Sequence, residues 1–506
     1  MRLHFTGALT ARDCKQHTIH SFNLTEGRWL EIDFAYAPDG AHGIANHLTL
    51  TLFDPQGFRG AGHRGGARHH VRLAPSVATP GYIAGPLPPG RWTVSIDAHM
   101  IMPGEPVRYT LDITVGDGVV SEVGDGEDDR SVVGSDAASH RIGASVPGDG
   151  MTRPRGAGWY RGDLHTHTEH SDARMFSVTD LLRTAQKLGL DFVFLTDHNT
   201  TSGLVEMDAQ SSPALLAAGG MELTTFWGHA LCLGTRDWVD WRVAPGSGGM
   251  ARLVAGAAAR DHLFVIAHPE ADGDPGCTGC RWRFREMMPG NAGLVEVWNG
   301  PWGCDSNNEA ALSLWYDWLN QGLRLVATAG SDYHGPADAA ASEIVADGAV
   351  DPGAAADAGV GFSVIYAASL GERELLDGLR AGHLYLSSGP EVGFEATDGK
   401  GGRWMMGDAI PPETVDGPLT MRVTWSGCPP DAQIRCVVNA RLLREWPADG
   451  EGATTWHTSG CDADWMVVEV RDGQGAMLAL TNPIYFGRSC DEELELEADV
   501  DVQTTL

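Results

Sequence analysis

Short apolar runs alternate with helical patterns in the middle of the chain, and this alternation limits the fold more than any other feature. The runs read DFVFLTDH, HLFVIAHPE, AGLVEVWNG, LRLVATAGSD and GFSVIYAAS, and amphipathic segments such as VTDLLRTAQKL (178–188) lie between them. Strands buried on both faces give continuous apolar runs, and their alternation with helices favours a parallel sheet. Residues 158–389 are therefore predicted to form an α/β domain, either a barrel or a doubly wound sheet.

Both flanks of this domain have the alternating pattern of antiparallel β-structure. WLEIDFAYA, HLTLTLFD and RWTVSIDAH lie within residues 1–116, and LTMRVTWSG and WMVVEVRD lie within residues 390–506. Each flank is predicted to be a β-sandwich. Residues 117–157 are rich in Gly, Asp and Ser and are predicted to be a flexible linker. The chain ends in an acidic tail that contains CDEELELEADVD.

One basic segment stands out in the first flank. RGAGHRGGARHHVR, residues 59–72, concentrates arginine and histidine between two predicted strands. The simplest interpretation is a solvated loop. The alternative is a contact with an anion or a sugar, and the sequence leaves both open.

Charge and hydropathy exclude several classes of protein. The chain has 36 Lys and Arg against 67 Asp and Glu, a net charge of -31, which repels nucleic acids and anionic membranes. It contains no run of about 18 apolar residues and no signal-peptide pattern, so no membrane association and a cytoplasmic location are expected. The nine cysteines form no dense framework, so reduced thiols are expected, with Cys277 and Cys280 as a weak metal or redox motif. A homo-oligomer stays open as a partner.

Potential metal ligands follow nearly every predicted strand of the middle domain. In a parallel barrel, the carboxyl ends of the strands meet at one rim, so these side chains are expected to converge. His165 and His167 are two residues apart on a strand, which points both rings to the same face. The nine candidates are His165, His167, Asp172, His198, Glu222, His229, His268, Asp332 and His334.

Imidazole and carboxylate ligands together are typical of Zn²⁺, Mn²⁺ or Fe²⁺ sites. Nine ligands are too many for one ion, so a site of two or three divalent ions is predicted. Such ions lower the pKa of water and polarise an ester, which indicates a hydrolase that uses a metal-bridging hydroxide.

The same motifs resemble those of the polymerase and histidinol phosphatase (PHP) superfamily. The similar segments are DLHTHTEHSD, TDHN, Glu222 with the GH pair after it, AHPE and SDYH, and together they span about residues 160–389. The resemblance implies a distorted (βα)7 TIM-like barrel with two or three metal ions. The phrases WYRGDLHTHT and TNPIYF are similar to the carbaryl-hydrolase-like branch of that superfamily.

The resemblance also implies a role for each ligand. His165, His167, Glu222 and Asp332 would hold the first ion. Glu222 would bridge to a second ion, which would also be held by His229 and His268. The third ion would be held by Asp172, His198 and His334. His229 and His268 are also candidates for the catalytic proton donor.

Residues outside the ligand set carry weaker predictions. Asn199 is a candidate substrate contact, and Arg281 and Arg283 could pair with a phosphate group, although a solvated turn or a salt bridge to the acidic surface explains the arginines more simply. His170 lies outside the ligand pattern and is expected to be exposed.

Two further acidic residues could form hydrogen bonds to the predicted ligands without binding an ion themselves. Asp163 and Glu296 are candidates for orienting a ligand histidine, and a plain strand-end hydrogen bond is the alternative for Asp163.

The predicted function is hydrolysis of a small-molecule phosphate mono- or diester. One alternative is a carbamate or aryl ester hydrolase, for which Trp298 and Trp302 would line the rim. Another is a non-catalytic binding protein in which the metal only stabilises the scaffold.

Overall fold

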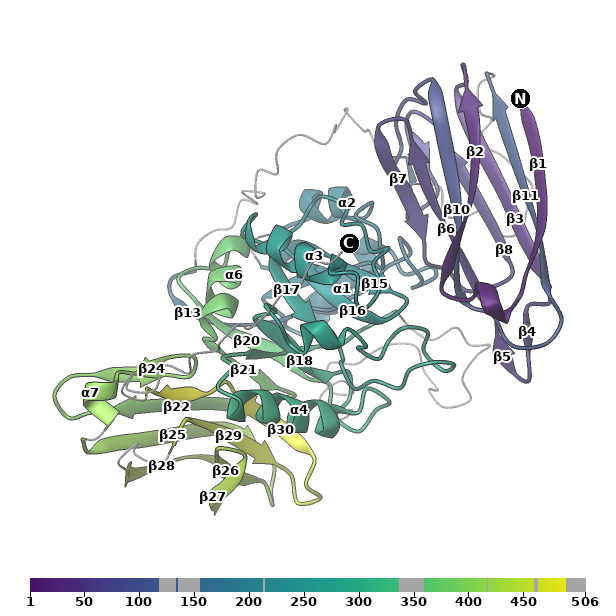
Figure 1. The fold of residues 1–506 in the computed structure, drawn as a ribbon. Coiled ribbons are helices and arrows are strands. Elements are labelled where there is room, and N and C mark those ends of the chain that lie inside the picture. The colour runs from purple at the N-terminus through teal and green to yellow at the C-terminus, as the bar shows by residue number, and fades with distance from the viewer. Residues whose placement is uncertain are drawn as a thin grey trace, which may run out of the picture.

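The computed structural model describes residues 1–117, 133–134, 155–212, 214–335, 359–415, 417–458 and 463–487. Most of the predicted linker and the acidic tail lie outside these ranges. Figure 1 shows an N-terminal β-domain in purple, a central α/β domain in teal and a C-terminal β-region in green and yellow. Within the described ranges, no helix has the length and apolar character needed to cross a membrane.

The N-terminal domain has two antiparallel sheets with an apolar core between them. Strand β11 alternates buried and more exposed residues, as expected for a sheet with one face on the core. The sheet orders are β1-β11-β3-β8-β9-β12 and β2-β10-β6-β7, beside a β4-β5 pair. The strands are β1 (Arg2–Leu9), β2 (Gln16–Leu24), β3 (Trp29–Ala37), β4 (Gly40–Ala41), β5 (Ile44–Ala45), β6 (His47–Asp54), β7 (Gly57–Gly62), β8 (Arg68–Leu73), β9 (Val77–Ala78), β10 (Gly90–Met100), β11 (Val107–Gly116) and β12 (Val133–Gly134), and a short 3-10 helix, η1 (Ala11–Asp13), follows β1.

The central domain places its strands in the order β19-β18-β17-β16-β15-β14-β13-β20-β21. Its strands are β13 (Gly158–Asp163), β14 (Phe192–Leu195), β15 (Leu216–Thr225), β16 (Gly228–Leu233), β17 (Leu263–Ile266), β18 (Leu294–Asn299), β19 (Val326–Gly330), β20 (Phe362–Ala367) and β21 (Leu384–Ser387). Its helices are α1 (Val178–Lys187), α2 (Leu204–Ala209), α3 (Gly249–Ala258), the 3-10 helix η2 (Arg285–Met287), α4 (Asn308–Asn320) and α6 (Glu372–Ala381). The predicted α/β class is therefore confirmed.

The sheet is not wholly parallel, however. The pairs β13–β14, β14–β15, β17–β18 and β18–β19 are parallel, whereas β16 is antiparallel to both of its neighbours. Only Phe226 and Trp227 connect β15 to β16, and so short a connection joins antiparallel strands only. Strand β20 is also antiparallel to both β13 and β21.

The part of the sheet from β19 to β13 curves, so that the segments following these two strands approach each other. Thr166 and Tyr333 form a parallel bridge, and the amide of Asp332 donates to the carbonyl of His165 at 2.9 Å. This curvature brings the segments after β13 and β19 together. The structure thus supports a curved mixed sheet, and a closed seven-stranded barrel stays a prediction.

The C-terminal region shares a sheet with the central domain. Strand β21 pairs with β30, and the order continues through β29 and β26 to β27. A second sheet, β23-β22-β25-β28, lies beside it. The elements are β22 (Glu391–Thr397), β23 (Arg403–Met405), β24 (Ala409–Ile410), α7 (Pro412–Val415), β25 (Leu419–Cys428), β26 (Gln433–Val438), β27 (Arg441–Pro447), β28 (Gly450–Thr458), β29 (Trp465–Arg471), β30 (Met477–Thr481) and β31 (Ile484–Phe486).

One expectation about the cysteines is wrong. Cys277 and Cys280 are joined as a disulfide rather than being free thiols. Cys14, Cys232 and Cys304 are free, in line with the expectation for the rest of the chain.

Candidate metal centre

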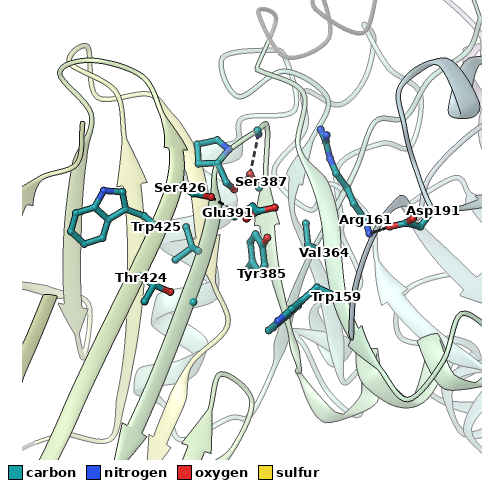
Figure 2. A pocket seen from close by; sticks show the side chains of 14 residues that line it. Trp159, Arg161, Asp191, Val364, Tyr385, Ser387, Glu391, Thr424, Trp425 and Ser426 are labelled. Atoms are coloured by element: carbon teal, nitrogen blue, oxygen red, sulfur yellow. Dashed lines mark hydrogen bonds between the residues drawn. The ribbon is translucent and has the colours of Figure 1, made fainter. Parts of the chain in front are cut away.

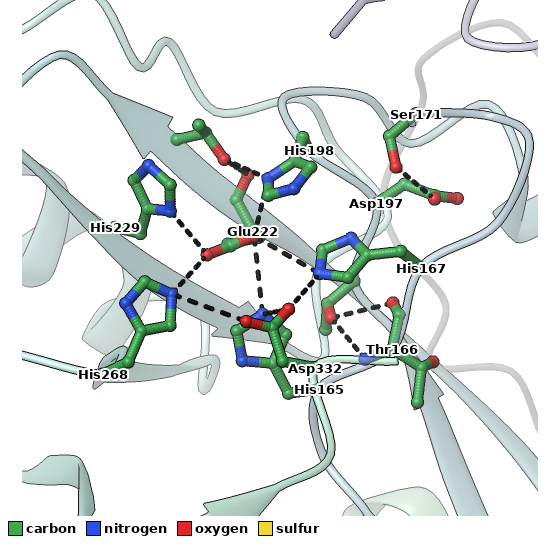
Figure 3. Close-up of polar contacts among 12 residues, drawn as sticks. His165, Thr166, His167, Ser171, Asp197, His198, Glu222, His229, His268 and Asp332 are labelled. Carbon is green, nitrogen blue, oxygen red and sulfur yellow. Dashed lines mark hydrogen bonds and ion pairs between the residues drawn. The ribbon is translucent and has the colours of Figure 1, made fainter. Parts of the chain in front are cut away.

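Glu222, near the end of β15, lies at the middle of a buried histidine cluster (Figure 3). Its Oε1 lies 3.0 Å from His229 Nδ1 and 3.3 Å from His268 Nε2. Its Oε2 faces the other way and lies 2.6 Å from His198 Nδ1, 3.4 Å from His165 Nε2 and 3.5 Å from His167 Nε2. The two oxygens therefore face two separate sets of imidazoles, which is the arrangement of a carboxylate that bridges two ions.

Asp332 lies beside His165 and His167, which face Oε2 of Glu222. Its Oδ1 lies 2.9 Å from His167 Nε2 and 3.3 Å from His165 Nε2, and its Oδ2 lies 4.0 Å from His268 Nε2. The residue has a φ of 52°, in the left-handed region, directly after β19. The chain turns there so that the carboxylate points back at the cluster, as Figure 3 shows.

A third group of ligands lies at the more exposed side of the cluster. Asp172 Oδ2 lies 3.4 Å from His198 Nε2, and its Oδ1 lies 3.4 Å from His334 Nε2. The His167 and His334 rings stack with centroids 4.1 Å apart. The side chains of Asp172 and His334 are 27% and 38% exposed, so the cluster is accessible to solvent at this group.

The strand ends fix the positions of these side chains. His165 and His167 extend β13, and the amide of His167 donates to the carbonyl of Tyr333 at 3.0 Å. A bridge between His198 and Glu222 holds the extension of β14 against β15. The sequence predicts that these side chains converge at the strand ends, and the structure brings them together there.

Two acidic residues, Glu296 and Asp163, form hydrogen bonds to the residues of the cluster. Glu296 Oε1 lies 3.0 Å from His165 Nδ1, and the Glu296 carboxylate also accepts the amide of His268 at 3.0 Å. The contact between Glu296 and His165 Nδ1 leaves His165 Nε2 to face Glu222. Asp163 accepts the amides of His165 and Ser331 and thus ties the two strand ends together rather than orienting an imidazole ring.

Sequence reasoning missed Asn299. Its Nδ2 donates to Glu296 at 3.0 Å and to Asp332 at 3.3 Å, so one amide steadies two acidic groups. The only sequence signal was its place at the end of the run VEVWN.

Electrostatics in the cluster keep the carboxylates charged. Burial alone would raise the pKa of Glu222, but His198 and His165 hold it well below its usual range. Burial likewise opposes the charge on Asp332, and the pKa of that carboxyl is held low mainly by His165. Burial beside other imidazoles lowers the pKa of His167 to about 3. Burial opposes the charge on His165 and His198, but Asp332 and Glu222 hold the pKa of His165 and of His198 well above the usual range. A divalent ion bound by these imidazoles would displace their protons.

Unsatisfied atoms show that the residues fit such ions. His165 Nε2 is buried, lies 3.4 Å from Glu222 Oε2 and has no hydrogen-bond partner, and the buried nitrogens His167 Nδ1, His229 Nε2 and His268 Nδ1 also have none. Buried polar atoms are normally paired, so atoms that converge without bonding one another are expected around a cation. In the described part of the chain, four overlapping groups of side chains have their potential ligand atoms within 4.8 Å of one another. The first is His167, Asp172, His198 and His334, and the second is His165, His268 and Glu296. The third is His165, His167 and Asp332, and the fourth is His198, Glu222 and His229.

The predicted substrate contacts do not join this cluster. The Asn199 side chain donates to the carbonyl of Thr224 at 2.9 Å and accepts its amide at 2.8 Å, so its polar atoms are used within the fold. Arg281 and Arg283 are exposed, and Arg281 forms an ion pair with Glu270. The arginines thus match the solvated-turn interpretation.

The expectation that His170 is exposed is wrong. The residue is 5% exposed, and its Nδ1 lies 2.8 Å from Ser202 Oγ. The amide of Gly81, from the N-terminal domain, donates to the same nitrogen at 3.4 Å. His170 is buried because the N-terminal domain covers it, which sequence reasoning on the middle domain alone did not include.

A cavity of about 490 Å³ lies away from the metal ligands, between the central domain and the C-terminal region (Figure 2). Trp159, Arg161, Tyr385, Glu391 and Trp425 are among its lining residues. The cavity shares no residue with the ligand groups, so we assign it no part in the chemistry.

Comparison with solved structures finds remote similarity. A two-domain protein from Bacteroides vulgatus that contains a predicted PHP-like metal-dependent phosphoesterase is 14% identical, with 69% of this chain and 100% of that chain covered and a TM-score of 0.35. A protein from Bifidobacterium adolescentis, assigned as a metal-dependent phosphoesterase, is 16% identical, with 34% and 87% covered and a TM-score of 0.26. The pre-peptidase C-terminal domain of a Bacillus anthracis collagenase is 16% identical, with 22% and 90% covered and a TM-score of 0.16.

No protein-family model matches the chain, and no curated protein matches it.

Proposed function

We propose that the protein is a metal-dependent phosphoesterase of the PHP superfamily. The observation that carries the proposal is Glu222, whose two carboxylate oxygens face two different sets of histidines in a buried site. The superfamily assignment is supported by the segments DLHTHTEHSD, TDHN, AHPE and SDYH. The carbaryl-hydrolase-like branch is supported only by WYRGDLHTHT and TNPIYF, which lie outside the ligand set apart from the shared histidines.

The first two ions would share Glu222. Oε2 of Glu222 would hold the first ion together with His165, His167 and Asp332. Oε1 would hold the second together with His229 and His268. When bound, divalent ions supply a nucleophile from water at neutral pH and stabilise negative charge on the ester oxygens.

The third ion would lie at the accessible side of the cluster. Asp172, His198 and His334 would hold it, and His167 belongs to the same group. Because Asp172 and His334 are partly exposed, we propose that the ester enters from this side.

Proton transfer to the leaving group needs a general acid, and the candidates are His229, His268 and bound water. His229 and His268 each direct one nitrogen at Glu222, and the other nitrogen of each ring is buried without a hydrogen-bond partner. A proton-donor role for either ring would use that second nitrogen. The pH profile of kcat in the His229→Gln variant tests this role, because loss of a donor removes the alkaline limb of the profile.

A phosphate ester fits this centre better than an aryl carbamate. Phosphoryl oxygens need cationic partners, and the bound ions would supply them where Arg281 and Arg283 do not. The aryl alternative depended on Trp298 and Trp302, but both indoles are buried, and their Nε1 atoms donate to Gly300 and Glu309. These tryptophans pack within the fold.

The test is a comparison of three chromogenic substrates on protein loaded with Mn²⁺ or Zn²⁺. They are p-nitrophenyl phosphate, bis(p-nitrophenyl) phosphate and 1-naphthyl N-methylcarbamate, each assayed with the His165→Ala variant as control. The proposal expects turnover of a phosphate ester that the variant loses. Turnover of the carbamate alone, or no turnover of any substrate, would contradict it.

A further inference from the structure

Three histidines of the N-terminal domain lie beside the candidate metal centre, with His63 and His99 buried and His47 partly buried. His47 begins β6, His63 follows β7 and His99 lies in β10, so neighbouring strands of one sheet carry all three. Their ring centroids are 4.8 to 5.0 Å apart. The His63 ring lies 4.6 Å from the ring of His198, a ligand of the proposed third ion. We call His47, His63 and His99 the histidine triplet.

The triplet is not part of the apolar core of its own domain. That core is built from aliphatic and aromatic side chains such as Leu50, Trp92 and Ile113. His63 is 8% exposed and His99 is fully buried. Polar side chains are costly to bury without partners, so their place at the domain surface that covers the centre calls for an explanation.

Unpaired nitrogens of the triplet indicate a ligand. His47 Nε2, His63 Nδ1 and His99 Nδ1 are buried and have no hydrogen-bond partner. The neighbouring indole Nε1 of Trp241, stacked on His99 with centroids 5.5 Å apart, is also unpaired. An indole N–H can only donate and an imidazole can donate, so the partner that suits all of them is an oxygen acceptor.

The contact between the two domains is held by specific bonds. Lys15 Nζ donates to the carbonyl of Phe226 at 2.8 Å and pairs with Asp274 at 2.6 Å. Gly81, with a φ of 91°, accepts a bond from Thr200 Oγ1 at 2.8 Å and donates to Ser202 Oγ at 3.1 Å. A Cβ at Gly81 would lie 2.7 Å from the carbonyl oxygen of His170, so only glycine allows this approach. The triplet is therefore held in place beside the centre.

We propose that His63 contacts the substrate and donates a hydrogen bond to a phosphoryl oxygen, while His47 and His99 position it. Thr49 Oγ1, 3.0 Å from His99 Nε2, fixes the His99 ring and leaves its Nδ1 free. The triplet is absent from the ligand groups found among the described residues, which favours an oxyanion over a further metal ion. This inference rests on the proposed function, because it takes the phosphoryl group as the ligand. The N-terminal domain then supplies part of the active site.

The test is the binding of inorganic phosphate, the product, to Mn²⁺-loaded protein by isothermal titration calorimetry. His63→Ala should weaken phosphate binding about tenfold, as expected for the loss of one hydrogen bond to an anion. His63→Gln should recover part of the affinity, because an amide can still donate. The matched control is His70→Ala, since His70 lies at the exposed surface of the same domain and pairs with Asp33. Metal content, measured by mass spectrometry, should be the same in all four proteins.

Two outcomes separate this inference from the proposed function. Phosphate binding by His63→Ala equal to that of the wild type would overturn the inference alone. No phosphate binding by the loaded wild-type protein would overturn the proposed function and the inference with it. If His63→Ala loses metal, the phosphate-binding comparison uses His63→Gln instead. Loss of metal in His63→Gln as well would mean that the triplet only supports the metal centre, and this would overturn the inference.

Discussion

The two β-regions are joined to the central domain in opposite ways. The N-terminal sheets are separate from the central sheet, yet their side chains reach the metal centre, with the His63 ring 4.6 Å from that of His198. The C-terminal region continues the central sheet through the β21–β30 pair. Its contacts involve residues remote from the ligands, such as Tyr316 Oη bonded to Glu469 at 2.6 Å.

A region can therefore extend the central sheet without lying near the candidate site, and another region can reach that site without sharing a sheet with the central domain. In α/β domains, reactive groups gather beyond the carboxyl ends of the strands. The N-terminal domain covers that end and can add side chains to the site, whereas the C-terminal region extends the sheet edge and can only stabilise it.

The largest loss of activity is expected from a substitution in the candidate metal centre itself. Glu222→Gln removes the charge that both sets of histidines face, so metal binding and turnover should fall together, with turnover reduced roughly a thousandfold or more. The measurement is kcat with bis(p-nitrophenyl) phosphate beside metal content. Retained turnover in this variant would contradict the contrast between the two β-regions, because catalysis would then not depend on the cluster that the N-terminal domain covers.

Asn482 tests the structural role of the C-terminal region. It is buried, accepts the amide of Ala327 at 2.8 Å and donates to the carbonyls of Ala327 and Leu384. Asn482→Ala leaves these groups unpaired and should lower the free energy of unfolding by about 2–4 kcal/mol. Urea unfolding measures the loss, and metal content and KM should not change. A raised KM would place this region in the site.

Lys15 tests the N-terminal contact with a smaller change. Lys15→Met keeps the apolar stem but removes the bonds to Phe226 and Asp274, which should cost about 1 kcal/mol of stability. Since the triplet is then held less firmly, KM should rise several-fold while kcat changes little. The exposed Lys187→Met is the control. Equal KM values in both variants would count against a shared active site.

The smallest effect is a pH dependence at the C-terminal contact. Burial opposes the charge on Asp408, but its hydrogen bond with His383, 2.9 Å long, lowers the pKa of Asp408 below its ordinary value. A carboxyl with a lowered folded-state pKa stabilises the fold above its unfolded pKa, about 4, and loses that contribution as the pH falls through the folded value. The difference in unfolding free energy between wild type and Asp408→Asn should therefore be largest near pH 7 and shrink below about pH 4. A difference that is the same at pH 7 and pH 3 would contradict this assignment.

Much of the centre could be predicted from sequence because its ligands follow buried strands. His165, Asp332 and the other ligand candidates stand at ends of apolar runs, where the topology of a parallel sheet brings them together. The direction of β16 could not be read from the run GHALCLG, since it depends on the tight connection at Phe226 and Trp227. The continuation of the central sheet into β30 likewise depends on pairing between segments far apart in the chain.

The triplet was hidden for a different reason. His63 lies within RGAGHRGGARHHVR, and the expectation of a solvated loop there is wrong, because the segment contains the end of β7 and most of β8 and buries Arg59 and His63. Domain docking places the His63 ring against His198. The same docking buries His170, which the sequence pattern placed at the surface. Contacts between domains leave no periodic signal in either segment, so the sequence could suggest an anion contact at residues 59–72 but could not place it.

The most direct test of the account is anomalous diffraction from crystals of the Mn²⁺- or Zn²⁺-loaded protein. We predict one peak bounded by His165, His167, Asp332 and Glu222 Oε2, and a second bounded by His229, His268 and Glu222 Oε1. Two peaks on opposite sides of one carboxylate would establish Glu222 as the bridge on which the proposed chemistry depends. A single peak that does not contact Glu222, or no peak in the cluster, would contradict the account.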